Sequence, residues 1–165
     1  MKWDAGFNFR RSGVKDMVEQ MFLGRYFHTL DNKGRLTVPA RYREMLEPGA
    51  YITKGFEVNL TVMTPAAFAN ISKQVSEKSY TDPVARLLRR FIFSNGEFVE
   101  LDKSGRILIP QFLRETANLE SEVVLVGVGD SFEIWSPTNW HDQDELLADT
   151  KANVERFVAY DISTS

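Results

Sequence analysis

The sequence contains two closely related copies of a fifteen-residue stretch, and this internal repeat most strongly constrains the fold. Residues 30–44 read LDNKGRLTVPARYRE, and residues 101–115 read LDKSGRILIPQFLRE. Two copies are too few for a solenoid, which needs three or more stacked units. The repeat therefore predicts a duplicated, pseudo-symmetric domain. An offset of 71 aligns seven identical pairs: Leu30/Leu101, Asp31/Asp102, Gly34/Gly105, Arg35/Arg106, Pro39/Pro110, Arg43/Arg114 and Glu44/Glu115.

The similarity between the copies continues beyond this stretch. With a one-residue insertion the offset becomes 72, so that Gly55 aligns with Gly127 and Pro65 with Pro137. Each copy is therefore expected to form a strand, a D-x-x-G-R turn, a second strand, a short helix, two strands around a glycine, and a helix that begins at a proline. Proline suits a helix start because the first N–H groups of a helix have no partner within it.

Polar and apolar side chains alternate over residues 35–38, which is the period of a half-buried strand. Leu36 and Val38 are expected to face the core, while Arg35 faces outward. In the second copy, residues 123–128 form a continuous apolar run, which is typical of a fully buried strand.

The repeat divides the chain into five predicted parts. Residues 1–20 have no counterpart in it, and we expect them to form a flexible extension; the alternative is an arm that grips nucleic acid through Arg10 and Arg11. The weakly patterned segment beyond residue 149 is expected to fray. The parts are the extension 1–20, a first half 21–75, a helical connector 76–95, a second half 96–150 and an acidic tail 151–165.

Composition narrows the class of protein. A chain of 165 residues is long enough for one domain or two small ones. The absence of cysteine excludes a disulfide framework, a thiolate nucleophile and a cysteine-ligated metal. The sequence has neither an apolar run long enough to span a membrane nor an N-terminal apolar run like that of a signal peptide. We therefore expect a cytoplasmic protein with no membrane partner.

The net charge of −3 conceals an uneven distribution of charge. Residues 21–45 contain five lysines and arginines against two acidic residues, whereas residues 116–165 contain two basic residues against ten acidic ones. Because salt screens charges beyond roughly 8–10 Å, a basic face can bind phosphate while the far end remains acidic. The acidic balance is therefore compatible with DNA binding.

No combination of residues in the sequence resembles a catalytic site. The two histidines, His28 and His141, lie far apart and outside any metal-ligand spacing. Asp31 and Asp102 could form a pair of carboxylates, but each has an arginine four residues later, which favours an ionised structural pair over a raised pKa. We predict no enzyme activity, no catalytic residue, no metal and no cofactor.

The repeated D-x-x-x-R unit has two physical interpretations. In the first, the aspartate closes the turn and the arginine pairs with it, so the unit is purely structural. In the second, the aspartate orients the guanidinium so that its donors project toward phosphate or a guanine edge. Repetition of the whole unit favours the second interpretation.

A helix expected over residues 83–93 carries three arginines. Arg86 and Arg90 are four residues apart and so share one face of the helix. This pattern favours a stripe that faces solvent or another subunit over a second DNA site.

The segment MFLGRYFHTLDNKGRLTVPARYRE, together with the second copy LDKSGRILIPQFLRE, resembles the MraZ family of bacterial transcriptional regulators. The resemblance covers residues 21–147, and two D-x-x-x-R motifs at this separation are highly specific. The chain departs from the family pattern in its twenty-residue leader and its acidic C-terminal tail.

The resemblance implies a fold that is α+β and mainly β: a duplicated AbrB-like swapped-hairpin β-barrel with short helices packed around it. It also implies a ring-shaped homo-oligomer that binds direct repeats in promoter DNA, is associated with the nucleoid, and autoregulates the division and cell wall gene cluster. The family's DNA-binding residues correspond here to Asp31, Lys33, Arg35, Asp102, Lys103 and Arg106.

Three other functions remain open from the residues alone. One is a protein-interaction module that controls a partner enzyme without sequence-specific DNA binding. Another is an antitoxin-like protein of the AbrB fold, although such proteins append a toxin-wrapping tail to one hairpin unit and this chain has two units. A hydrolase is the weakest of the three.

Overall fold

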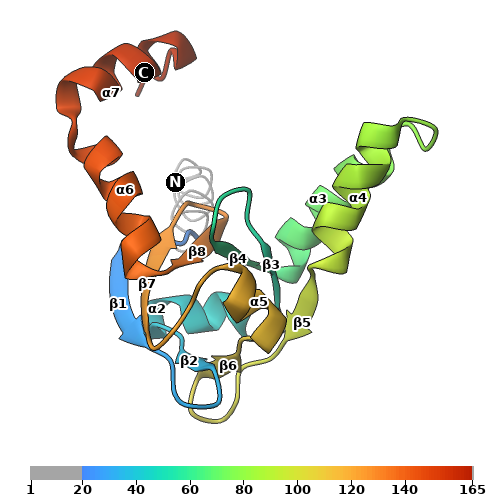
Figure 1. Cartoon of the computed structure of the whole chain (residues 1–165), viewed down its shortest axis with the longest axis vertical. Helices are drawn as coiled ribbons and strands as arrows, with labels where there is room; N and C mark the ends of the chain where they lie inside the picture. Colours follow the sequence, from blue (N-terminus) through green and yellow to red (C-terminus); the bar gives the residue numbers. More distant parts are fainter. Residues whose placement is uncertain (1–19, 165) are drawn as a thin grey trace, which may run out of the picture.

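The computed structural model of the chain describes residues 20–164 (Figure 1). The predicted flexible extension, 1–20, therefore lies outside the described residues except for Gln20. The strands are β1 (Arg25–Thr29), β2 (Arg35–Thr37), β3 (Ala50–Lys54), β4 (Leu60–Met63), β5 (Glu97–Val99), β6 (Arg106–Leu108), β7 (Glu122–Gly127) and β8 (Ser131–Trp135). The helices are α2 (Ala40–Arg43), α3 (Pro65–Ser76), α4 (Pro83–Ser94), α5 (Gln111–Thr116), α6 (Pro137–Ala148) and α7 (Thr150–Phe157), with 3-10 turns η1 (Glu44–Leu46) and η2 (Val158–Tyr160).

The strands form two antiparallel sheets that follow the sequence repeat. A six-stranded sheet has the order β1-β7-β8-β4-β3-β5, and β2 pairs with β6 in a separate two-stranded ribbon. The order is symmetric: β1, β7 and β8 follow one another from one edge of the large sheet, as β5, β3 and β4 do from the other edge. β1 pairs with β7, and β5 pairs with β3, so each copy contributes its first strand to the other copy. This exchange confirms the predicted pseudo-symmetric duplication.

Two features of the expected fold are wrong. The helices contain more residues than the strands do, so the fold is α+β but not mainly β. The six strands form an open sheet with β1 and β5 at its edges, and no closed barrel is present in residues 20–164. β2 and β6 form their own ribbon, and a single antiparallel bridge joins Leu36 of β2 to Leu30, just after β1.

The core lies between the large sheet and the β2–β6 ribbon, and residues from both copies form it. Leu36 and Val38 are fully buried, as the alternating pattern predicted. Phe132 packs against Phe22 and Tyr42, with ring centroids 5.4 and 5.1 Å away. The run that begins at Val123 forms the buried strand β7, also as predicted. The two halves are thus a single packed unit.

The local signals for helix starts are confirmed in α3, α4 and α6. The hydroxyl of Thr64 accepts a hydrogen bond from the N–H of Ala67, at 3.2 Å, and proline occupies the first turn. Asp82 caps α4 and Ser136 caps α6 in the same way. Pro39 lies at the N-cap of α2, although its fixed φ also suits the first helical turn, where the sequence predicts it.

Two helical arms extend from the sheet on the side away from the β2–β6 ribbon (Figure 1). One arm consists of α3 and α4, and the other of α6 and α7. The segment expected to fray forms α7, which begins where the carboxylate of Asp149 accepts a hydrogen bond from the N–H of Ala152, at 3.1 Å. Within residues 20–164, no helix is both long and apolar enough to cross a membrane.

Two of the three arginines of α4 make hydrogen bonds within their own arm, so the stripe expected to face solvent or another subunit is partly engaged. The guanidinium of Arg86 donates to the carbonyls of Tyr80 and Thr81, at 3.1 and 3.0 Å, and that of Arg89 donates to the carbonyl of Ser76, at 2.8 Å. These two arginines therefore satisfy the carbonyls of the α3–α4 connection. Only Arg90 of the three lies fully exposed on the surface.

Candidate nucleic-acid interface

The two D-x-x-x-R turns lie side by side at the end of the molecule opposite the arms (Figure 1). Antiparallel pairing of β2 with β6 sets Arg35 opposite Leu108 and Thr37 opposite Arg106. The intervening residues point into the core, so these four side chains share the outer face of the ribbon. Two arginines that are 71 positions apart in sequence are thereby brought onto one small surface.

The first turn is closed by the carboxylate of Asp31. Its Oδ1 accepts hydrogen bonds from the backbone N–H groups of Lys33 and Arg35, at 3.0 and 2.8 Å. Its Oδ2 lies 2.5 Å from Nε of Arg35. Asp31 thus holds both the backbone of the turn and the guanidinium that follows it.

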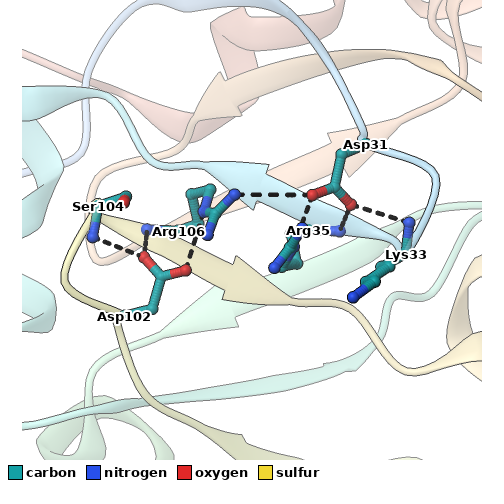
Figure 2. A network of polar contacts seen from close by, with 6 residues as sticks. All are labelled: Asp31, Lys33, Arg35, Asp102, Ser104 and Arg106. Atoms are coloured by element: carbon teal, nitrogen blue, oxygen red, sulfur yellow. Dashed lines mark hydrogen bonds and ion pairs between the residues drawn. The ribbon is translucent and has the colours of Figure 1, made fainter.

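The second turn repeats this arrangement around Asp102. Its Oδ1 accepts from the N–H groups of Ser104 and Arg106, both at 2.9 Å, and its Oδ2 accepts from Nε of Arg106 at 2.8 Å. Nη1 of Arg106 also lies 3.8 Å from Oδ2 of Asp31, which joins the two turns into one polar network (Figure 2). The guanidinium of Arg106 is therefore held by both turns, and that of Arg35 by its own turn.

Both aspartates remain ionised at neutral pH. The backbone N–H of Arg35, together with its guanidinium and the N–H of Lys33, lowers the pKa of Asp31 from 3.8 to about 2, against a partial desolvation that raises it. The backbone N–H and guanidinium of Arg106 lower the pKa of Asp102 in the same way. These carboxylates are suited to orienting arginines and not to acid–base chemistry.

Comparison with protein families matches residues 21–91 and 92–159, one after the other, to the family described as "MraZ protein, putative antitoxin-like". The chain belongs to the MraZ family. This confirms the resemblance inferred from the repeated motif and establishes two MraZ repeats in the chain.

Several proteins named transcriptional regulator MraZ are similar to the chain over most of its length. The protein of Thermomicrobium roseum is 46% identical over 128 residues, which is 78% of this chain and 90% of that protein. That of Leuconostoc mesenteroides is 43% identical over 143 residues, 86% of this chain and 100% of the relative. The protein of Roseiflexus castenholzii is 42% identical over 137 residues, which is 83% of this chain and 94% of that protein. These names describe regulators, in agreement with the prediction that the chain is not an enzyme.

In this MraZ family member, the cationic groups of the ribbon remain open to a ligand. The side chains of Arg35 and Arg106 are 32% and 31% exposed, and aspartate holds them chiefly through Nε. Lys33 and Lys103 are exposed, and no described carboxylate lies within ion-pair distance of either ammonium group. The outer face thus presents two guanidinium groups held by aspartate and two exposed ammonium groups.

Two further arginines are identical in both copies of this MraZ repeat, Arg43 and Arg114, but are not among the residues that the sequence assigns to the site. Nε of Arg43 donates to the carbonyl of Val38 at 2.8 Å, and Nε of Arg114 donates to the carbonyl of Ile109 at 3.0 Å. Both therefore lie beside the ribbon. The sequence signal for these two residues is that arginine occupies the same position in both copies. A charged residue is not kept there for burial in the core, so its repetition indicates another role.

Proposed function

We propose that this chain is a sequence-specific DNA-binding transcriptional regulator that binds direct repeats in the promoter of its own operon, the division and cell wall gene cluster, and is associated with the nucleoid. The observation that supports it most is the pair of aspartate-oriented arginines on one two-stranded ribbon. A β-ribbon fits into the major groove of DNA, where an arginine can donate two hydrogen bonds to a guanine edge.

The residues of the two turns have different roles in this proposal. Arg35 and Arg106 contact the DNA, and Asp31 and Asp102 hold their guanidinium groups in position. Orientation before binding reduces the entropy lost when an arginine side chain is ordered on DNA. Lys33 and Lys103 contact phosphates and contribute affinity without sequence preference.

We further propose that copies of the chain associate head to tail through the two arms. α4 contains three arginines and no acidic residue, whereas α6 contains three acidic residues and no lysine or arginine. Each arm also exposes apolar side chains. On α4, Val84 and Leu87 are 72% and 62% exposed, and on α7 and η2, Val154 and Val158 are 67% and 74% exposed. Contact between the unlike arms of two copies would cover both apolar faces and pair opposite charges.

Head-to-tail association agrees with an operator made of direct repeats. A cyclic ring presents the same ribbon in the same orientation on every subunit, whereas a two-fold dimer would require a palindrome. One ribbon offers few base contacts, so several subunits bound to adjacent repeats would supply the affinity.

The DNA-binding proposal is tested by titrating the purified protein against its own upstream promoter DNA and scrambled DNA of equal length, at several salt concentrations. We expect preferential binding to the promoter, with affinity that falls steeply as salt rises because phosphate contacts release counterions. Replacing one direct repeat within the promoter should reduce binding, and replacing an equal length between repeats is the control. Equal and weak binding to both DNAs would reject the proposal in favour of an interaction module that controls a partner enzyme.

The assembly proposal predicts that Leu87→Asp converts the oligomer to smaller species, because a carboxylate would be buried in an apolar contact. Light scattering coupled to size-exclusion chromatography measures the mass, and circular dichroism checks that the fold is kept. Lys73→Asp, on the exposed surface of α3, introduces the same side chain in the same arm as a control. An unchanged mass for Leu87→Asp would exclude α4 from the interface.

A further inference from the structure

Two arginines of the repeat lie against the turn of the other copy and not against their own. A Cβ placed on Gly105 would lie 2.6 Å from Nε of Arg43, and a Cβ placed on Gly34 would lie 2.5 Å from Cζ of Arg114. At both distances a side chain on the glycine would force the guanidinium to move. Each guanidinium therefore packs directly on the bare backbone of the opposite turn.

Backbone hydrogen bonds complete the contact on each side. The N–H of Val38 donates to the carbonyl of Gly105 at 2.9 Å, and Arg43 donates to the carbonyl of the same Val38 at 2.8 Å. Arg43, Val38 and Gly105 thus form a closed set of contacts.

The pseudo-symmetric set is formed by Arg114, Ile109 and Gly34. The N–H of Ile109 donates to the carbonyl of Gly34 at 2.9 Å, and Arg114 donates to the carbonyl of Ile109 at 3.0 Å. The same crossed arrangement therefore occurs twice in the molecule.

We infer that Arg43 and Arg114 are positioning residues that act across the two halves: Arg43 fixes the second turn, 102–106, and Arg114 fixes the first turn, 31–35. Glycine is favoured in each turn for two reasons, the backbone conformation and the close approach of the guanidinium. Gly34 and Gly105 have φ of +83° and +74°, which L side chains rarely adopt, and a side chain at either position would displace the guanidinium that packs on it. This accounts for the identity of these glycines and arginines in both copies.

The consequence for DNA binding rests on the function proposed above. The turn that carries Asp31 and Arg35 is held by an arginine of the second half, and the turn of Asp102 and Arg106 by an arginine of the first. A change in one half therefore displaces the DNA-contacting arginine of the other. Each turn is thus held in place by a side chain of the other half.

Amide hydrogen exchange in the free protein tests the crossed contacts directly. For Arg43→Ala, we expect exchange about two- to tenfold faster at the amides of Asp102 and Gly105, which corresponds to the loss of one ordinary hydrogen bond, and no change at Asp31 and Gly34. Arg114→Ala should give the reverse pattern.

The matched control is Arg41→Ala, in the same helix as Arg43. The side chain of Arg41 is exposed and makes no hydrogen bond or ion pair within residues 20–164. The replacement should leave both turns unchanged. Arg43→Lys keeps the charge but lacks the planar guanidinium and Nε, so it should behave like alanine. If Arg43→Ala does not fold, amide hydrogen exchange is measured on Arg43→Met, which keeps most of the aliphatic part of the side chain.

Faster exchange in a variant's own turn, or equally in both turns, would overturn the inference. Recovery of the slow exchange by lysine would also overturn it, because charge alone would then suffice. These outcomes do not depend on DNA, so a failure of the proposed regulator function would leave the exchange pattern as a separate result.

In DNA binding, the crossed contacts predict a specific coupling. Arg114→Ala and Arg35→Ala should be less than additive in their loss of promoter affinity, since both disable the first turn. Arg114→Ala and Arg106→Ala should be close to additive. If Arg114→Ala were instead additive with Arg35→Ala and less than additive with Arg106→Ala, Arg114 would act on the turn of its own half.

Discussion

Replacing Arg35 with alanine is expected to weaken binding to promoter DNA by about 1–3 kcal/mol, the cost of one lost bidentate contact with a base. Arg106→Ala should have an effect of the same order, because its guanidinium is held by an equivalent turn. The double replacement should abolish sequence preference while the lysines retain some affinity for any DNA. Binding isotherms on promoter and scrambled DNA, measured at the same salt concentration, give both quantities.

The loss of sequence preference separates base contacts from phosphate contacts. Lys33→Ala should reduce binding to both DNAs almost equally and make the salt dependence shallower, as expected for a lost phosphate contact. Lys73→Ala removes an exposed cation from α3, remote from the ribbon and outside the proposed assembly contact, and should change neither. Unchanged isotherms for both Arg35→Ala and Arg106→Ala would remove the ribbon from the DNA interface and leave its ion pairs as turn closures.

The second large effect is expected from Phe132→Ala, which should reduce the free energy of unfolding by about 3–5 kcal/mol. Phe132 is fully buried on β8, between Phe22 and Tyr42 of the first half. Its removal leaves a cavity where the two halves meet, so both should unfold together at lower denaturant. Chemical denaturation, followed by fluorescence and circular dichroism at one fixed protein concentration, measures the change.

Phe27→Ala provides the matched control for the core, because Phe27 is 77% exposed on β1. Its replacement should change the free energy of unfolding by less than about 0.5 kcal/mol. Two separate transitions for Phe132→Ala would show that the halves unfold independently, contrary to the shared core.

Features that depend on a few neighbouring residues were predictable from the sequence. The helices that begin at Pro65 and Pro137 and the closure of both D-x-x-x-R turns follow from hydrogen bonds that span four residues or fewer. The alternation that buries Leu36 is equally local. The residues of the two turns can therefore be named from the sequence, whereas their relative positions cannot. Their direct contact with DNA, like the five-part division of the chain, remains a prediction.

By itself, the sequence determined that two similar units exist, where both D-x-x-x-R turns and the helices led by Pro65, Pro83 and Pro137 begin, and that Leu36 and Val38 face inward. Only the tertiary structure decided which copy each strand joins, that the sheet stays open, and that Arg43 packs on Gly105 of the other copy. The physical reason is that the two copies carry nearly the same local pattern. Strands of either copy satisfy that pattern equally well, so partner choice depends on burial summed over the whole chain, which no short stretch of sequence contains.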